Sequence, residues 1–319
     1  MCLVKSKEDR ETAVQQTLSR DVTLIGTGLH SGRPARIRVS PAPVGHGIWF
    51  CRTDITDRDN KVEARWNNVS DTVLNTRIAN ASGVEVSTIE HLMAAIAGCG
   101  IHNALIEIDG PEVPIFDGSS VKFAQSFLNA GITPQKAPVQ MIRILRPVRV
   151  ERGDAFAEFD SHDGFEMDYS IEFSDQAIGA QSLRLDLSNG AFLRELADCR
   201  TFCRKSEVDH LHAQGLALGG TLNNAVVVDE AEILTPGGFR RSDECVRHKM
   251  LDALGDLSLA GAPILGRYKG HKAGHAMTNL LLRKLFDTPR AFRVETATDE
   301  NDLALPGMQL KARDLASVG

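Results

Sequence analysis

The sequence lacks the features that mark several large classes of protein. No apolar run approaches the ~18 residues of a membrane-spanning helix, and the N-terminus has no apolar core of a secretory signal. The 36 Lys and Arg residues are outnumbered by 42 Asp and Glu, which gives a net charge of −6. This balance argues against nucleic-acid binding. We expect a globular protein with no membrane anchor and no nucleic-acid partner.

Paired cysteines are also missing. No Cys-x-x-Cys spacing occurs, so neither a disulfide scaffold nor a structural zinc knuckle is indicated. Reduced thiols are the default in the cytoplasm, which is where we expect this protein. The six cysteines are Cys2, Cys51, Cys99, Cys199, Cys203 and Cys245.

Motifs for nucleotide chemistry and serine catalysis are absent as well. The sequence has no Gly-x-x-x-x-Gly-Lys-Ser/Thr loop and no Gly-x-Gly-x-x-Gly after an expected strand, which argues against an NTPase or a nucleotide-cofactor enzyme. No Gly-x-Ser-x-Gly elbow occurs either, so a serine hydrolase is not indicated. A nucleotide can still be part of a substrate.

What remains is an ordinary globular composition, with 42% hydrophobic and 24% charged residues. Hydrophobic patterning predicts an α+β protein in which strands precede helices twice. We expect a loose N-terminal arm over 1–20, a first α+β domain over 21–132, a linker over 133–140 and a second α+β domain over 141–319. Strands and helices are predicted at 22–25, 35–39, 47–51, 88–98 (helix), 104–108, 119–129 (helix), 143–150, 155–159, 165–173, 183–187, 188–196 (helix), 205–213 (helix), 225–229, 243–259 (helix), 264–268 and 275–286 (helix).

The helix predicted over 243–259 carries a regular row of polar residues. His248, Asp252 and Asp256 follow one another at intervals of four and share a face opposite Val246 and Met250. An i, i+4 His/Asp pair can place an imidazole nitrogen and a carboxylate oxygen on one metal ion. A solvated polar face gives the same spacing, and both interpretations stay open.

A second cluster is Glu90-His91 at the start of the helix predicted over 88–98. Ser87-Thr-Ile-Glu90 fits a capping box, in which Glu90 only satisfies the helix terminus. The functional alternative makes His91 a metal ligand and Glu90 a base. Zinc hydrolases need three protein ligands and a nearby carboxylate. His91, His248, Asp252 and Glu90 together supply that set.

Two further segments contain residues suited to catalysis. In Gly270-His-Lys-Ala-Gly-His275 a histidine can act as a general acid for a leaving amine. In Arg200-Thr-Phe202 the hydroxyl of Thr201 can donate to an oxyanion, although a helix cap explains that threonine equally well.

At this point the segments resemble a known family, the UDP-3-O-acyl-N-acetylglucosamine deacetylases, which are zinc amidases of lipid A biosynthesis. The matching segments follow the family's order from about Val22 to Phe286. They are Gly26-Thr-Gly-Leu-His-Ser-Gly32, Ser87-Thr-Ile-Glu-His-Leu-Met-Ala-Ala95, Pro114-Ile-Phe-Asp-Gly-Ser119, Arg200-Thr-Phe202, Leu218-Gly-Gly220, Val246-Arg-His-Lys-Met-Leu-Asp-Ala-Leu-Gly-Asp256 and Lys272-Ala-Gly-His-Ala276.

The resemblance implies a fold of two domains of similar topology, each a β-sheet layer packed on a helix layer, with the active site between them. It implies one catalytic zinc ion, with His91, His248 and Asp252 as its ligands. It also implies Glu90 as general base, His275 as proton donor with Asp256 as its partner, and Thr201 as oxyanion stabiliser.

Residues that contact the substrate are implied in the same way. Lys249 and Lys272 correspond to lysines near the diphosphate, Phe173 with Glu172 beside it to the aromatic residue that stacks on the uracil, and Phe202 to a further substrate contact. The passage for the acyl chain is expected at Val208, Leu222, Ala225 and Val227. Two departures from the family pattern, the polar segment Cys203-Arg-Lys-Ser206 and Ala155, affect this part of the site.

The function expected from the resemblance is hydrolysis of the N-acetyl group of UDP-3-O-acyl-N-acetylglucosamine, which yields acetate. The alternatives are a zinc deacetylase of another N-acetyl sugar and a non-catalytic protein that binds the UDP-lipid. We expect a monomer that has at most weak contact with membranes through its acylated substrate.

Overall fold

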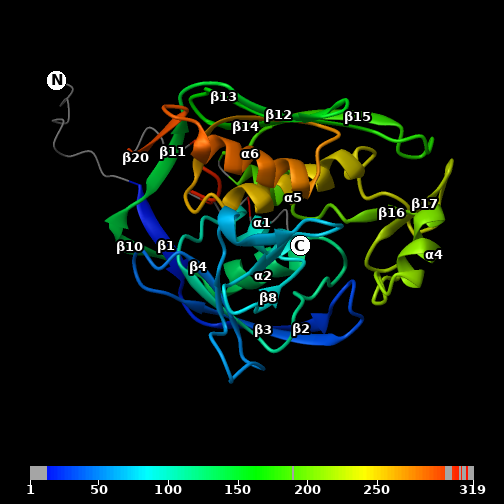
Figure 1. Ribbon diagram of the computed structural model, residues 1–319, viewed down its shortest axis with the longest axis horizontal. Coiled ribbons are helices and arrows are strands. Elements are labelled where there is room, and N and C mark those ends of the chain that lie inside the picture. The colour runs from blue at the N-terminus through cyan, green and yellow to red at the C-terminus, as the bar shows by residue number, and fades with distance from the viewer. Residues whose placement is uncertain (1–12, 189, 299–303, 309, 311–313, 315–319) are drawn as a thin grey trace.

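The computed structural model describes residues 13–188, 190–298, 304–308, 310 and 314. Two large sheets form its outer layers, and two layers of helices lie between them (Figure 1). The predicted α+β class is therefore confirmed. None of the described helices is long and apolar enough to cross a membrane.

The sheet of the first half has five strands in the order β2–β3–β9–β4–β5. The central β9 pairs antiparallel with β3 and parallel with β4. Along β3 buried and exposed residues alternate, as expected for a sheet with one face on the core. Its strands and the two helices of this half are β2 (Val22–Thr27), β3 (Pro34–Pro41), β4 (Ile48–Arg52), β5 (Lys61–Glu63), β9 (Ala104–Ile108), α1 (Glu90–Gly98) and α2 (Val121–Ala130).

The second sheet has seven strands, three of which pair with β19. This strand pairs antiparallel with β13 and parallel with β11 and β14. Helices α5 and α6 pack beneath the sheet (Figure 1). The elements are β11 (Gln140–Ile144), β12 (Val148–Arg152), β13 (Ala155–Asp160), β14 (Phe165–Glu172), β15 (Ala180–Asp186), β19 (Ile264–His271), β20 (Phe292–Thr296), α5 (Glu244–Ser258) and α6 (His275–Asp287).

Smaller units flank the two large sheets. A three-stranded sheet follows β5, and a second one accompanies α4 at one side of the molecule (Figure 1). The remaining elements are β1 (Val14–Leu18), β6 (Val69–Asp71), β7 (Arg77–Ala79), β8 (Glu85–Val86), β10 (Ile132–Pro138), β16 (Phe202–Arg204), β17 (Val226–Asp229), β18 (Glu232–Ile233), α3 (Ala191–Glu195), α4 (Lys205–Ala213) and the 3-10 helix Trp66–Asn68.

Three predicted segments differ from what the structure shows. The expected arm over 1–20 contains β1, and most of the expected linker over 133–140 belongs to β10, the antiparallel partner of β1. Residues 1–12 lie outside the described part of the chain. The single strand expected over 143–150 is two strands, β11 and β12. Pro147 lies between them, and a proline has no amide hydrogen for a sheet ladder.

Helix α1 is buried on nearly all sides because α5 crosses it on the side facing the second sheet. Gly255 lies at the closest approach, and a Cβ added there would stand 2.0 Å from the carbonyl oxygen of Glu90. The backbones can approach this closely only because residue 255 has no side chain. The crossing brings the N-terminal turn of α1 against the middle of α5.

We predict that Gly255→Ala destabilises the protein by about 1–3 kcal/mol, because the new methyl group overlaps the α1 backbone. Helix propensity alone acts in the opposite direction, since alanine in a helix interior is favoured over glycine by about 0.5–1 kcal/mol. Urea unfolding measures the difference. Gly110→Ala is the control, because a Cβ at Gly110 meets no atom within 4 Å. A more stable Gly255→Ala protein would contradict the close crossing.

Candidate metal and catalytic site

Three potential metal ligands converge where α1 and α5 cross. His91 comes from α1, and His248 and Asp252 lie one turn apart on α5. One ligand atom of each lies within 4.8 Å of the others. All three are buried, with exposed fractions of 4%, 2% and 6%. The alternative of a solvated polar face on α5 is therefore wrong.

The atoms at the centre of this cluster are arranged as metal ligands would be. Oδ1 of Asp252 is buried and makes no hydrogen bond within the described residues. Nε2 of His91 and Nε2 of His248 lie 3.4 Å and 3.3 Å from it. An unpaired buried carboxylate oxygen is costly unless a cation completes its surroundings. The cluster therefore fits a divalent metal ion held by two imidazoles and a carboxylate.

Neighbouring groups prepare the ligands for this role. Nδ1 of His248 lies 3.0 Å from the carbonyl oxygen of Cys199, which assigns the proton to Nδ1 and leaves Nε2 free to ligate. Burial lowers the pKa of His248 to about 4, so the ring is neutral. Burial opposes the charge of Asp252, but His248 and Lys249 hold its pKa well below its usual range. Metal ligands are needed in these protonation states.

Glu90 lies beside this cluster as the first residue of α1. Its Oε2 accepts a hydrogen bond of 3.0 Å from the amide of Thr76. Burial raises the pKa of Glu90, which suits a carboxylate that accepts a proton near neutral pH. The capping-box interpretation is wrong, because no side chain caps α1 and Ser87 instead donates to the carbonyl oxygen of Pro111.

A second proton-transfer group, His275, pairs with Asp256. Nδ1 of His275 lies 2.8 Å from Oδ2 of Asp256, which comes from α5 one turn after Asp252. Burial alone would lower the pKa of His275, but the Asp256 carboxylate raises it to about 9. The imidazole is thus held protonated at neutral pH, as a general acid must be.

Two aromatic rings extend from the metal cluster toward the edge of the second sheet. The Phe202 ring lies 6.4 Å from the His248 ring and 5.5 Å from the Phe173 ring, edge-on to both. Thr201 precedes Phe202, and its amide donates to the carbonyl oxygen of Gly118. Thr201 is not a helix cap, because the residue that caps the following helix is Arg204.

The two lysines predicted near a diphosphate are both paired with carboxylates. Nζ of Lys249 lies 2.7 Å from Oδ2 of Asp252, the oxygen that does not face the imidazoles. Lys272 lies 2.7 Å from Asp154 and 2.6 Å from Glu172. Glu172 and Lys272 are therefore brought together at the sheet edge, next to Phe173.

The residues predicted for an acyl passage lie on α4, on β17 and in the loop that joins them. Val208 lies on α4 and Val227 on β17, and these two elements are in contact. Ala225 is buried, whereas Leu222 is 43% exposed. The polar segment Cys203–Ser206 spans the end of β16 and the start of α4, and Ala155 begins β13 next to Asp154.

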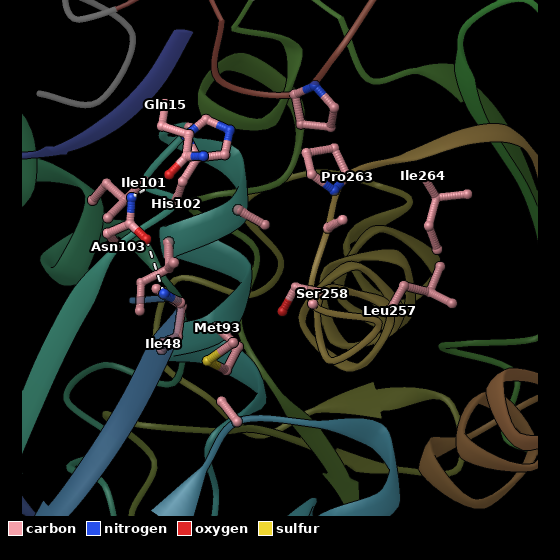
Figure 2. Close-up of a pocket in the computed structure, with 18 of the residues that line it drawn as sticks. Gln15, Ile48, Met93, Ile101, His102, Asn103, Leu257, Ser258, Pro263 and Ile264 are labelled. Carbon is pink, nitrogen blue, oxygen red and sulfur yellow. Dashed lines mark hydrogen bonds between the residues drawn. The ribbon is translucent and has the colours of Figure 1, made fainter. Parts of the chain in front are cut away.

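A cavity of about 350 Å³ lies away from this cluster. Figure 2 shows Met93 of α1 and Leu257 of α5 on its walls, beyond the crossing of the two helices, with Ile48 and Asn103 from the first sheet and its loop. None of the predicted site residues lines it. The cavity is therefore separate from the catalytic groups.

Sequence reasoning missed three residues that shape the site. Thr76 binds Glu90, the Cys199 carbonyl binds His248, and Glu244 holds the backbone amide and guanidinium of Arg200 at 2.9 Å. Glu244 thereby fixes the segment Arg200–Phe202 on the start of α5. No spacing pattern in the sequence marks these residues, because each acts across a long sequence separation.

Comparison with known proteins agrees with this geometry. Residues 15–287 match the family model described as UDP-3-O-acyl N-acetylglycosamine deacetylase. This chain belongs to that family. The matched range contains the metal cluster, Glu90, Asp256 and His275.

Individual family members are similar over almost their whole length. The UDP-3-O-acyl-N-acetylglucosamine deacetylase of Phenylobacterium zucineum is 47% identical over 286 residues, covering 90% of this chain and 98% of the relative. Proteins of the same name from Pasteurella multocida and Haemophilus influenzae are 44% and 43% identical, covering 90% and 91% of this chain and 94% and 95% of each relative.

We predict that Asp256→Asn lowers the pKa of His275. The folded-state value of about 9 depends on the Asp256 charge, and without it burial favours the neutral ring. The pKa should fall by about two units or more, so the imidazole would lose its proton well below pH 9. NMR titration of the His275 ring measures this shift in the metal-free protein.

Asp243→Asn is the matched control, because Asp243 lies next to α5 but pairs with Arg247. It should leave the titration of His275 unchanged. A pKa of His275 that stays the same in Asp256→Asn would show that another group holds the proton.

Proposed function

We propose that this chain is a zinc-dependent deacetylase that removes the acetyl group from UDP-3-O-acyl-N-acetylglucosamine, a step of lipid A biosynthesis. The observation that carries the proposal is the meeting of a His-His-Asp ligand set with a buried carboxylate and a protonated histidine. The family match and relatives of 43–47% identity support the substrate. The preference of zinc for nitrogen and carboxylate ligands with an open position supports zinc as the metal.

The ligand set His91, His248 and Asp252 would hold one zinc ion. When bound, zinc polarises a carbonyl and lowers the pKa of a coordinated water toward ~7. Lys249 holds the second oxygen of Asp252, so Oδ1 stays directed at the imidazoles. These residues fix the place where the amide is attacked.

Two groups of the protein move protons in the reaction. Glu90 takes a proton from the attacking water as the water oxygen forms a bond to the acetyl carbon. His275 gives its proton to the sugar nitrogen as the carbon–nitrogen bond breaks, which releases acetate and a free amine. Thr201 is only partly buried, and its hydroxyl can donate to the oxyanion.

The binding of the remaining parts of the substrate is proposed on charge and polarity. Lys249 and Lys272 would contact the diphosphate. Each ammonium group has three N–H donors, so Lys249 can keep its bond to Asp252 while it donates to a phosphate oxygen. Phe173 would stack on the uracil beside Glu172. Phe202 would make a further contact with the substrate. The acyl chain would lie along Val208, Leu222, Ala225 and Val227.

We also propose the two domains 21–132 and 141–319, because each range contains one of the large sheets and two of the helices between them. A cytoplasmic location is supported by the five described cysteines, all of which carry free thiols. The sixth, Cys2, lies outside the described residues. The monomeric state and weak membrane contact through the substrate stay predictions.

Acetate release from UDP-3-O-acyl-N-acetylglucosamine tests the proposal. We expect turnover by the purified protein, loss of turnover after chelation, and recovery when zinc is added back. Recovery is expected because the three ligands lie on two helices, α1 and α5, that pack directly against each other.

The matched substrate for comparison is UDP-N-acetylglucosamine without the 3-O-acyl chain. A much lower kcat/KM for this compound would support the acyl passage. Equal values would favour a deacetylase of another N-acetyl sugar, and tight binding of the acylated substrate without acetate release would favour a non-catalytic protein.

A further inference from the structure

Thr76 lies immediately before β7, the middle strand of the small three-stranded sheet β6–β7–β8. Its side chain is buried, with an exposed fraction of 2%. It is neither a metal ligand nor a proton donor or acceptor in the reaction proposed above. Even so, it contacts both groups on which proton transfer depends.

The backbone of Thr76 binds the general base. Its amide donates to Oε2 of Glu90 at 3.0 Å, which leaves Oε1 of that carboxylate for the water. The same peptide segment is tied to the turn that precedes α1. Asn75 accepts from the amide of Thr88, and the carbonyl oxygen of Thr76 accepts from the amide of Ile89 at 3.4 Å.

The side chain of Thr76 binds the partner of the general acid. Its hydroxyl donates to Oδ1 of Asp256 at 2.5 Å. The other oxygen of Asp256, Oδ2, is thereby left for Nδ1 of His275 at 2.8 Å. The carboxylate is held between two donors from different parts of the chain, and its rotation is restricted.

We propose that Thr76 is a positioning residue that holds Glu90 and the Asp256–His275 pair in register for proton transfer. The inference rests on the proposed function, since it assigns Thr76 a part in that reaction. The three-stranded sheet β6–β7–β8 gains a role from it, which is to carry Thr76 to the junction of α1 and α5. A residue that only filled space would not donate hydrogen bonds to both Glu90 and Asp256.

Thr76→Val is the principal test, because valine keeps the size and the amide but removes the hydroxyl. We expect kcat for acetate release to fall about tenfold to a hundredfold, as small misplacements of catalytic groups do. KM and the bound zinc should be unchanged, since neither the substrate contacts nor the ligands are touched. Thr76→Ser restores the hydroxyl and should recover kcat to within about threefold of wild type.

Thr17→Val is the matched control for the loss of a buried threonine hydroxyl. Thr17 is 6% exposed and donates to the carbonyl oxygen of Asn103 at 2.7 Å. It should lose stability without a change in kcat. If Thr76→Val does not fold, Thr76→Ala removes the same hydroxyl with less bulk and carries the same expectation.

A spectroscopic measurement separates this inference from the proposed function. The proton between His275 and Asp256 should give a low-field NMR resonance, which Thr76→Val should shift or broaden whether or not the protein releases acetate. If wild-type protein with zinc released no acetate, the proposed function would be contradicted, but the positioning of the Asp256–His275 pair by Thr76 would not. An unchanged resonance and kcat in Thr76→Val, or a loss that Thr76→Ser does not recover, would overturn the positioning role.

Discussion

The close crossing of α1 and α5 is the constraint on which the rest of the site depends. Gly255 lets the α5 backbone approach the carbonyl oxygen of Glu90. As a result, residues separated by more than 150 positions in the sequence share one small volume. The metal ligands, Glu90 and Asp256 come from this junction, and His275 at the start of α6 reaches it through Asp256. The two large sheets hold the helices against each other from outside.

The junction concentrates buried charge, which would destabilise the fold if it were unpaired. The structure gives each carboxylate at least one hydrogen-bond partner. Asp252 is held by Lys249, Asp256 by His275 and Thr76, and Glu90 by the Thr76 amide. Oδ1 of Asp252 is buried, faces the two imidazoles and has no hydrogen-bond partner among the described residues. The electrostatics of the site therefore leave a single place for a cation.

The sequence predicted this site in part because helix geometry relates residues at intervals of four. The spacing of His248, Asp252 and Asp256 placed them on one face, and the elements 104–108 and 205–213 were predicted with the observed bounds. Burial of that face could not be derived from spacing, because it depends on α1 packing across it. The same limit explains why the capping-box and solvated-face interpretations stayed open.

Tertiary contacts decided what local patterns did not. The short strands between 61 and 86 carry little periodic signal, so Thr76 had no mark in the sequence. Strand β10 was predicted as a linker because it contains two prolines. Within the described residues it pairs with β1 alone, and prolines are tolerated in such an edge strand. The roles of the individual residues came from family resemblance, and the geometry supplies a physical reason for those of the His-His-Asp cluster, Glu90 and the Asp256–His275 pair.

Anomalous scattering at the zinc absorption edge, from crystals of the protein purified with zinc, tests the central claim most directly. The account predicts one peak at the junction of α1 and α5, about 2.0–2.2 Å from Nε2 of His91, Nε2 of His248 and Oδ1 of Asp252. A zinc ion bound at other residues, with this cluster lacking a peak, would contradict it.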